Sequence, residues 1–299
     1  MLFTAERKAW TINEYYIVYN PSAGDGTCKA EAEILYVVYP DAILVNMNRI
    51  IDYRVFLSGM DESDKLILCG GDGTLSWFIN KTRDIEIRSE IYFYSVGNGN
   101  DFAQDIGRER GATPDFTINS YIKDLPIVKI NGEQRLFING IGYGMDGFCM
   151  RAPDAEQRSR RQNRFSSKMD ATIGFLFHYK PIDLLAQVDG NTQHYKNVWF
   201  AHTMKGGCLG GVMIVPQQNR LEDEEISFVV LHGIGRWKAL RLFLSMINGK
   251  CVKGKKGIEV IRGKHVQVAF GEKVSVQVDG GMVDNVEEYA IDSQRNRRD

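Results

Sequence analysis

The feature that most constrains the fold is an alternation of short apolar runs with helical stretches between residues 15 and 125. Runs this short and this apolar are typical of parallel strands that are buried on both faces and joined by crossover helices. We expect strands at residues 15–19, 42–45, 65–69 and 91–96, and helices at 30–38, 49–59 and 75–81. The sequence therefore predicts an α/β domain with a doubly wound parallel sheet over residues 1–125.

After residue 125 the pattern changes to the period-two alternation of half-buried strands. The pairs Asn131-Gly132 and Asp189-Gly190 are typical of tight hairpin turns. We expect strands at 126–130, 134–138, 184–188, 197–201, 226–231, 266–270 and 274–278, and one helix at 237–247. A second domain over 126–299 is thus predicted to be a mainly antiparallel β-sandwich, and it is left open whether its last residues return to the first domain.

Composition excludes several classes of protein. The chain is 43% hydrophobic and 25% charged, as ordinary globular proteins are, and its formal net charge of −1 disfavours a basic nucleic-acid binder. Five scattered cysteines without a C-x-x-C pair indicate a reducing compartment. No apolar stretch is long enough for a leader or a membrane span. We therefore expect a cytoplasmic protein, with peripheral contact at the inner membrane face left open.

Three glycine-bearing turns each follow a predicted strand of the first domain. Strand carboxyl ends gather at one edge of such a sheet, where glycines and helix N-termini suit phosphate groups. Neither G-x-x-x-x-G-K-[ST] nor G-x-G-x-x-G occurs, and ordinary strand-ending turns are the alternative interpretation. The turns are Asn20-Pro21-Ser22-Ala23-Gly24, Gly70-Gly71-Asp72-Gly73-Thr74 and Gly97-Asn98-Gly99-Asn100-Asp101.

The second turn resembles the G-G-D-G-T motif shared by diacylglycerol kinases, sphingosine kinases and NAD kinases. The first is similar to the N-P-x-[SA]-G motif of the lipid kinases, and residues 97–103 are similar to their G-T-x-N-D-F-A motif. Residues 137–144 and 206–216 also fit the second domain of soluble bacterial members. The chain is identified as a member of the soluble diacylglycerol kinase-like lipid kinases.

This resemblance implies that ATP binds in a cleft between the two domains. It implies phosphate contacts from the first two turns, a role for Asp72 in organising Mg²⁺, and bracing of the third turn by Asn100 and Asp101. Asn98 replaces the threonine of the family motif. Arg164, in the basic segment 158–168, has the spacing of a phosphate-contacting arginine, with a solvated loop or a patch that meets anionic lipid as the alternative. Asn46 is a further candidate for nucleotide contact. The residues implied to bind nucleotide are Asn20, Pro21, Ser22, Ala23, Gly24, Asn46, Gly70, Gly71, Gly73, Thr74, Gly97, Asn98, Gly99, Asn100, Asp101 and Arg164.

Two departures from the family pattern concern carboxylates. Members carry D-G-E after a strand, with the glutamate proposed as general base, but here Gly281 follows Asp279 and Gly280. Either Asp279 becomes the catalytic base, or Asp284 or Glu287 replaces it, or the lipid kinase activity is weak or redirected. Relatives also bind a structural Mg²⁺ near D-G-L. Asp223 stands at the matching place and Glu224 replaces the glycine, with a solvated acidic loop as the alternative.

The function expected from these residues is an ATP- and Mg²⁺-dependent kinase that phosphorylates the hydroxyl of a diacylglycerol-like lipid. An NAD kinase-like enzyme is one alternative, and a nucleotide- or lipid-binding protein with impaired catalysis is another because of Gly281. The basic residues between 250 and 264 are expected either to meet an anionic membrane or to face water. The sequence does not identify the acceptor lipid and leaves a homodimer open.

Overall fold

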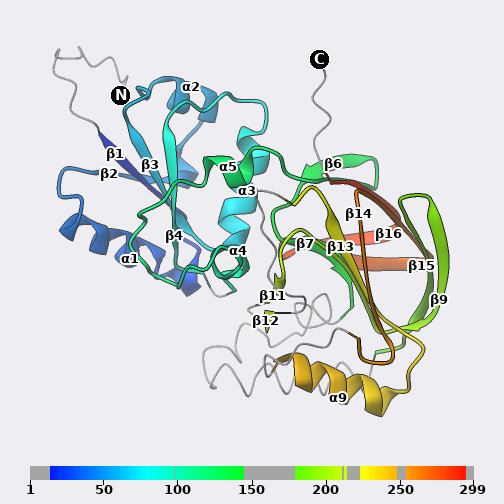
Figure 1. Ribbon diagram of the computed structural model, residues 1–299. Coiled ribbons are helices and arrows are strands. Elements are labelled where there is room, and N and C mark those ends of the chain that lie inside the picture. The colour runs from blue at the N-terminus through cyan, green and yellow to red at the C-terminus, as the bar shows by residue number, and fades with distance from the viewer. Residues whose placement is uncertain are drawn as a thin grey trace.

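The computed structural model describes residues 14–97, 99–144, 179–210, 212–213, 223–247 and 254–293. Its first sheet is parallel and has the order β2-β1-β3-β4 (Figure 1). The chain leaves β1 toward one edge of this sheet and continues from β3 toward the other, so the topological switch point lies between β1 and β3. Ligands bind at this position in doubly wound folds. The strands are β1 (Tyr15–Tyr19), β2 (Ile43–Asn46), β3 (Lys65–Gly70) and β4 (Glu90–Ser95).

Helix α3 (Asp72–Thr82) packs on this sheet by burying Leu75, Phe78 and Ile79. It begins three residues earlier than the sequence predicts, because Gly73 and Thr74, which are weak helix formers, still lie inside its first turn. The expected helix at 49–59 is also shorter. The other helices and single 3₁₀ turns of this domain are η1 (Gly24–Gly26), α1 (Cys28–Ile34), η2 (Leu35–Val37), η3 (Met47–Arg49), α2 (Tyr53–Ser58), α4 (Asp101–Asp105) and α5 (Asn119–Ile122).

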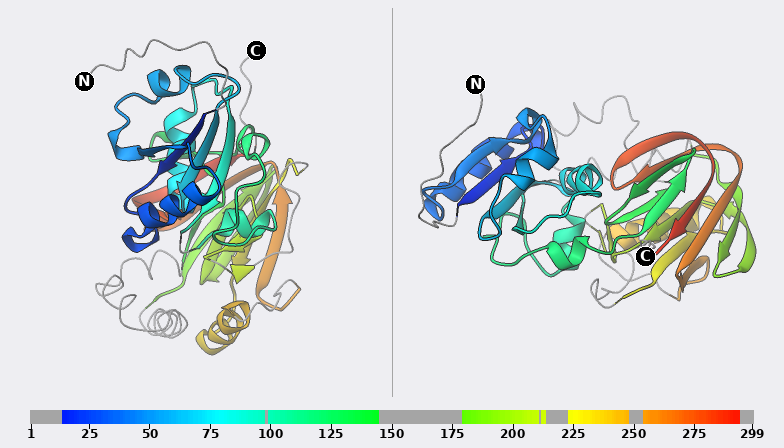
Figure 2. Two further views of the ribbon diagram at one scale, coloured as in Figure 1. Left: turned by 90° about the vertical axis from the view of Figure 1, so that its left-hand side faces the viewer. Right: turned by 90° about the horizontal axis from the view of Figure 1, so that it is seen from above.

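The second domain contains a ten-stranded antiparallel sheet that curls over its own apolar core (Figure 2). A short hairpin of β11 and β12 extends toward α4, and α9 covers a second apolar cluster. The predicted fold class, a parallel α/β domain followed by an antiparallel β domain, is confirmed. The elements are β5 (Ile127–Ile130), β6 (Glu133–Leu136), β7 (Gly140–Tyr143), β8 (Ile182–Val188), β9 (Asn191–Val198), β10 (Phe200–Met204), β11 (Cys208–Leu209), β12 (Val212–Met213), β13 (Ile226–Leu231), α9 (Arg236–Ile247), β14 (Ile258–Gly263), β15 (His265–Val278) and β16 (Gly281–Asp292).

Three two-residue turns set the register of this sheet. Asn131-Gly132, Asp189-Gly190 and Asp279-Gly280 each have positive φ at both residues, which defines the type I′ turn of tight hairpins. Two strand predictions are wrong in their limits. The run 197–201 is divided between β9 and β10, and Asn197 has a φ of 52° near the break. The runs 266–270 and 274–278 form one strand, β15, with irregular register between them.

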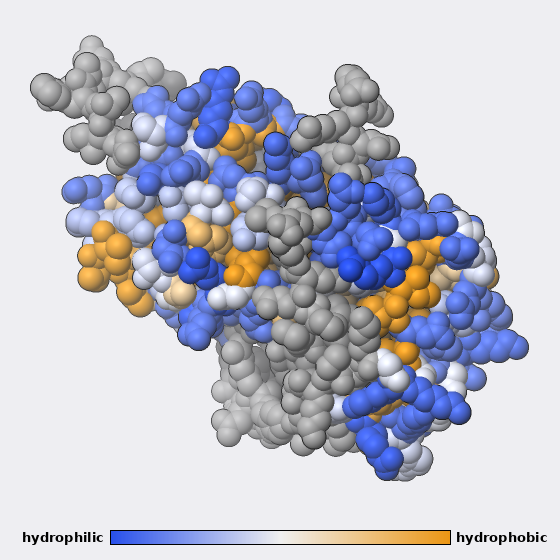
Figure 3. Space-filling model, in the orientation of Figure 1, coloured by the Kyte–Doolittle hydropathy of each residue, from blue (hydrophilic) through white to orange (hydrophobic). Residues whose placement is uncertain are grey.

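Apolar side chains are exposed on one flank of the first domain. Ile34 ends α1, Val37 ends η2 and Val38 follows it, and Ile43 on the edge strand β2 is exposed as well. Figure 3 shows this apolar patch over α1. Among the described residues, no helix has both the length and the apolar character needed to span a membrane.

Candidate functional site

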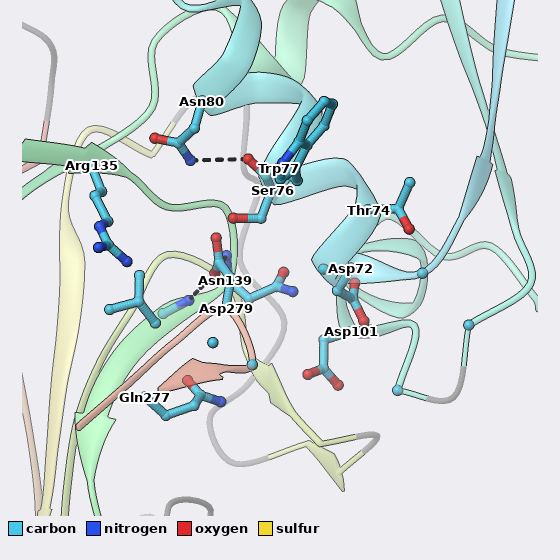
Figure 4. Close-up of a pocket in the computed structure, with 18 of the residues that line it drawn as sticks. Asp72, Thr74, Ser76, Trp77, Asn80, Asp101, Arg135, Asn139, Gln277 and Asp279 are labelled. Carbon is cyan, nitrogen blue, oxygen red and sulfur yellow. Dashed lines mark hydrogen bonds between the residues drawn. The ribbon is translucent and has the colours of Figure 1, made fainter. Parts of the chain in front are cut away.

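A cavity of about 1170 Å³ lies where the switch-point loops of the first domain face β6, β7 and the β15–β16 hairpin of the second (Figure 4). We call it the interdomain cavity. Its wall in the first domain is made by the loops after β1, β3 and β4 and by the first turns of α3. Residues between 20 and 101 in the first domain therefore meet residues 133–140 and 277–281 of the second domain around one space.

The loops after β3 and β4 touch backbone to backbone. A Cβ atom on Gly97 would lie 2.3 Å from the Cα of Gly71, so only glycine permits this approach. The loop after β1 is joined to the same site, because Asn20 Nδ2 donates a hydrogen bond of 2.9 Å to Thr74 Oγ1. The start of α3 is thus held open to the cavity, and the free N–H groups at a helix start favour an anion.

The structure brings most of the nucleotide candidates to this cavity. Asn20, Ala23, Gly24, Gly71, Gly73, Thr74, Gly97, Gly99 and Asp101 line it, whereas Pro21, Ser22, Gly70, Asn46 and Asn100 do not. Asn46 caps η3 by accepting from the Asn48 N–H. Asn100 braces its own loop, since it accepts from Ser95 Oγ at 2.6 Å and donates to the Gly97 carbonyl. Asn98 and Arg164 lie outside the described residues.

The Asp72 carboxylate points from the start of α3 toward the start of α4. Its two oxygens accept hydrogen bonds of 3.0 Å from the N–H groups of Asp101 and Phe102. These contacts fix the position of the loop after β4. Asp72 also lines the interdomain cavity beside Asp101. Mg²⁺ in kinase sites is held by one or two carboxylates together with substrate phosphates and waters, so this pair fits such an ion.

Helix α4 joins the two domains through carboxylates one turn apart. Asp101 Oδ2 accepts from the Gly210 N–H at 2.8 Å, and Asp105 Oδ1 accepts from the N–H groups of Gly207 and Cys208. The sequence analysis does not predict this role for Asp105, which is 4% exposed. The sequence signal for this role is the spacing of four residues between Asp101 and Asp105, because residues four apart lie on the same helix face.

Asp279 occupies the first turn position of the β15–β16 hairpin, and its carboxylate accepts several hydrogen bonds. Its oxygens accept from the N–H groups of Ile138, Asn139 and Gly140 at 2.8, 2.8 and 3.1 Å. Burial raises the pKa of this carboxyl above its ordinary value, although these three hydrogen bonds and one from Ser76 act in the opposite direction. Asp279 therefore fixes the hairpin against residues 138–140.

The other two carboxylates suggested in place of the missing glutamate lie elsewhere. Asp284 accepts from Ser275 Oγ at 2.6 Å, and Glu287 pairs with Lys273 at 3.5 Å on the surface. Neither residue lines the interdomain cavity, whereas Gly281 does. The suggestion that Asp284 or Glu287 replaces the base is thus not supported, because both side chains belong to the outer part of the hairpin.

The proposed structural metal position at Asp223 is occupied by protein cations. The Asp223 carboxylate accepts from the Arg262 guanidinium, which also contacts Glu225 at 3.2 Å, and Lys264 pairs with Glu224. Within the ranges given above, no group of three His, Cys, Asp or Glu side chains is placed to hold a metal ion. The donor set does not fit a bound Mg²⁺ there, since a guanidinium takes the place of the cation.

The same contacts change the interpretation of the basic residues between 250 and 264. Arg262 and Lys264 face the acidic loop that precedes β13, and Lys255 donates to Ser245. Lys250 and Lys253 fall outside the part of the chain that the structure describes. Membrane contact by this segment stays a prediction, with at least two of its cations engaged in ion pairs.

One face of α3 is attached to the second domain over about two turns. Ser76 bonds to Asp279, Asn80 exchanges two hydrogen bonds with the backbone of Leu136 at 2.8 and 2.9 Å, and Arg83 donates to the Gln134 carbonyl. Helix α3 thus begins at the interdomain cavity and also binds strand β6 of the second domain.

Comparisons with known proteins agree with this architecture. Residues 14–127 match the diacylglycerol kinase catalytic domain, and residues 139–289 match the YegS C-terminal NAD kinase beta sandwich-like domain. The chain belongs to the family of bacterial diacylglycerol kinase-like lipid kinases.

Individual relatives are distant in sequence. The chain is 22% identical to a diacylglycerol kinase of Bacillus subtilis over 75% of this chain and 73% of that protein. A crystal structure of a diacylglycerol kinase from Bacillus anthracis superimposes with a TM-score of 0.61 at 18% identity, covering 95% of this chain and 94% of the other. The structural likeness establishes the shared fold.

Proposed function

We propose that the protein uses ATP and Mg²⁺ to phosphorylate the hydroxyl of a diacylglycerol-like lipid in the interdomain cavity. The observation that carries this proposal is the meeting of three phosphate-suited loops with the β15–β16 hairpin around one space. Membership of a lipid kinase family supports the reaction type. The phosphate-suited loops all belong to the first domain, so we assign the ATP side of the cavity to that domain and the lipid side to the second.

On the donor side, the backbone around Gly71 and the start of α3 receives the phosphates of ATP. Asn20 and Thr74 hold the two neighbouring loops together through their hydrogen bond. Asp72 and Asp101 would hold Mg²⁺, which neutralises phosphate charge when it is bound. Positioning and charge neutralisation account for most of the catalysis of phosphoryl transfer.

On the acceptor side, the chain offers no free carboxylate at the position of the family glutamate. Asp279 keeps the hairpin in place but is already occupied by three N–H donors, so we assign it a positioning role rather than that of base. Because the transferred phosphoryl group carries much of the developing charge in a loose transition state, a general base is helpful rather than indispensable.

A binding protein with impaired catalysis is the second candidate, and Gly281 is the observation that favours it. The two candidates differ in one measurement, transfer of radiolabelled phosphate from ATP to a panel of lipids in mixed micelles. We expect labelled lipid with the wild-type protein. ATP binding without transfer to any lipid would favour the binding protein.

The site assignment is tested in the same assay with Asp72→Asn. Loss of the second carboxylate oxygen removes an acceptor for the α4 N–H groups and weakens the Mg²⁺ position, so we expect transfer to fall about 10²-fold or more. Asp41→Asn is the matched control, because Asp41 is exposed and does not line the cavity. Equal transfer by both variants would refute the assignment.

A further inference from the structure

Gln277 is a buried polar residue on the acceptor side of the interdomain cavity. It lies on β15 two residues before Asp279, lines the cavity and is 8% exposed. Its Oε1 atom is buried without a hydrogen-bond partner. Figure 4 shows the side chain on the cavity wall near Asn139 and Asp279.

Without a ligand, a buried amide oxygen that has no hydrogen-bond partner lowers the stability of the folded protein. Nearly all buried polar atoms in folded proteins have a partner, and one without it loses the hydrogen bonds that water would supply. The terminal torsion of glutamine is broad, so either end of the amide can turn to the cavity. A ligand that carries both a donor and an acceptor would satisfy the amide.

Gly281 lies close to Gln277 across the β15–β16 hairpin, and both residues line the interdomain cavity. Gly281 pairs with Val278 at the start of β16, and Gln277 pairs with the next residue, Met282. A Cβ atom on Gly281 would lie 3.3 Å from the Val278 carbonyl oxygen, which is a tight contact. Because successive residues of a strand point to opposite faces, position 281 shares the face of Val278, while the Gln277 amide lies on the other face.

We propose that Gln277 binds the acceptor, with its side-chain amide hydrogen-bonded to a hydroxyl of the lipid head, which is both donor and acceptor. This inference rests on the proposed function. In the step it serves, the hydroxyl oxygen forms a bond to the γ-phosphorus of ATP while the bond to the bridging oxygen breaks, and its electron pair leaves with ADP. The hydroxyl proton passes to an oxygen of the transferred phosphoryl group and then to water. The amide orients the hydroxyl and takes no proton.

The experiment compares Gln277→Leu with wild type by initial rates in mixed micelles of diacylglycerol, varying ATP and lipid separately. We expect kcat/KM for the lipid to fall about 10- to 100-fold, as when a site loses a hydrogen bond to a substrate hydroxyl, while KM for ATP changes less than about twofold. Gln267→Leu is the matched control, since Gln267 is exposed on the same strand and lies outside the interdomain cavity.

Thermal unfolding separates acceptor binding from a structural role. Because Oε1 has no partner to lose, Gln277→Leu should leave Tm unchanged or raise it. An unchanged kcat/KM for the lipid would overturn the proposal. A fall in Tm together with weaker ATP binding would also overturn it, because the amide would then support the fold.

Failure of the proposed function gives a different result. If the wild-type protein transfers phosphate to no lipid, binding of diacylglycerol micelles is measured by calorimetry in the presence of a non-hydrolysable ATP analogue. Binding by wild type that is weakened at least tenfold in Gln277→Leu would support the Gln277 site without kinase activity. Equal binding by the two proteins would refute it.

Discussion

His202 provides a quantitative test of the packing in the second domain. It lies in the middle of β10, is 0% exposed, and stacks on Phe200 with ring centroids 4.3 Å apart. On the neighbouring strand, a Cβ atom on Gly142 would fall 2.3 Å from the His202 ring, so the imidazole packs against bare backbone. This burial lowers the pKa of His202 from 6.5 to about 3.

The lowered pKa makes stability depend on pH. Between pH 6.5 and about 3, the unfolded chain binds a proton at His202 and the folded chain does not, so the free energy of unfolding falls as the pH falls through this window. From about pH 7.5 to about pH 5, these pKa values give a loss of roughly 2 kcal/mol. For a domain of this size, that corresponds to about 4–8 °C in Tm.

The assay is denaturant unfolding of wild type and His202→Phe at several pH values between about 7.5 and 5. Every other titrating group is common to both proteins, so the difference in their free energies of unfolding isolates His202. We expect that difference to shift by roughly 2 kcal/mol in favour of the variant on acidification. Parallel pH profiles for the two proteins would refute the burial argument.

Three further changes test the cavity and the acidic loop. Gly97→Ala places a Cβ atom against Gly71, so calorimetry should show at least about tenfold weaker ATP binding, and unchanged affinity would contradict the close approach. Gly281→Glu restores a carboxylate, and phosphate transfer should rise by about 10²- to 10⁴-fold if the missing base limits the rate; no rise would show that it does not. Arg262→Ala removes the partner of the Asp223 carboxylate, so Tm should fall by a few degrees and recover when Mg²⁺ is added. A wild-type Tm that depends on Mg²⁺ would argue against the Arg262 guanidinium as the native cation at this position.

The parts of the fold that the sequence predicts well are those set by local chemistry. Apolar runs mark the four strands of the first domain, and glycine-bearing turns follow three of them. The pairs Asn131-Gly132 and Asp189-Gly190 form the expected type I′ turns. Strand limits are predicted less well where the backbone departs from the period of two. The break between β9 and β10 near Asn197 is such a place.

The contacts that complete the site join residues far apart in the chain. Asp279 bonds to Ile138 across 141 positions, and Asp105 bonds to Gly207 across 102 positions. No local pattern specifies such a pairing, because it depends on how whole elements pack. The pairing of Asp223 with Arg262 has the same origin, so the sequence alone does not connect the acidic loop with the basic segment.

The contacts of helix α3 determine where the chain can accept an inserted residue. Asp72 contacts α4, while Ser76, Asn80 and Arg83 contact the second domain at spacings of four, four and three residues along one helix face. One inserted residue would turn everything beyond it by about 100° and remove these contacts from that face. An insertion in a surface loop leaves the ATP side and the lipid side of the interdomain cavity in the same relative position. An insertion inside α3 would change that position.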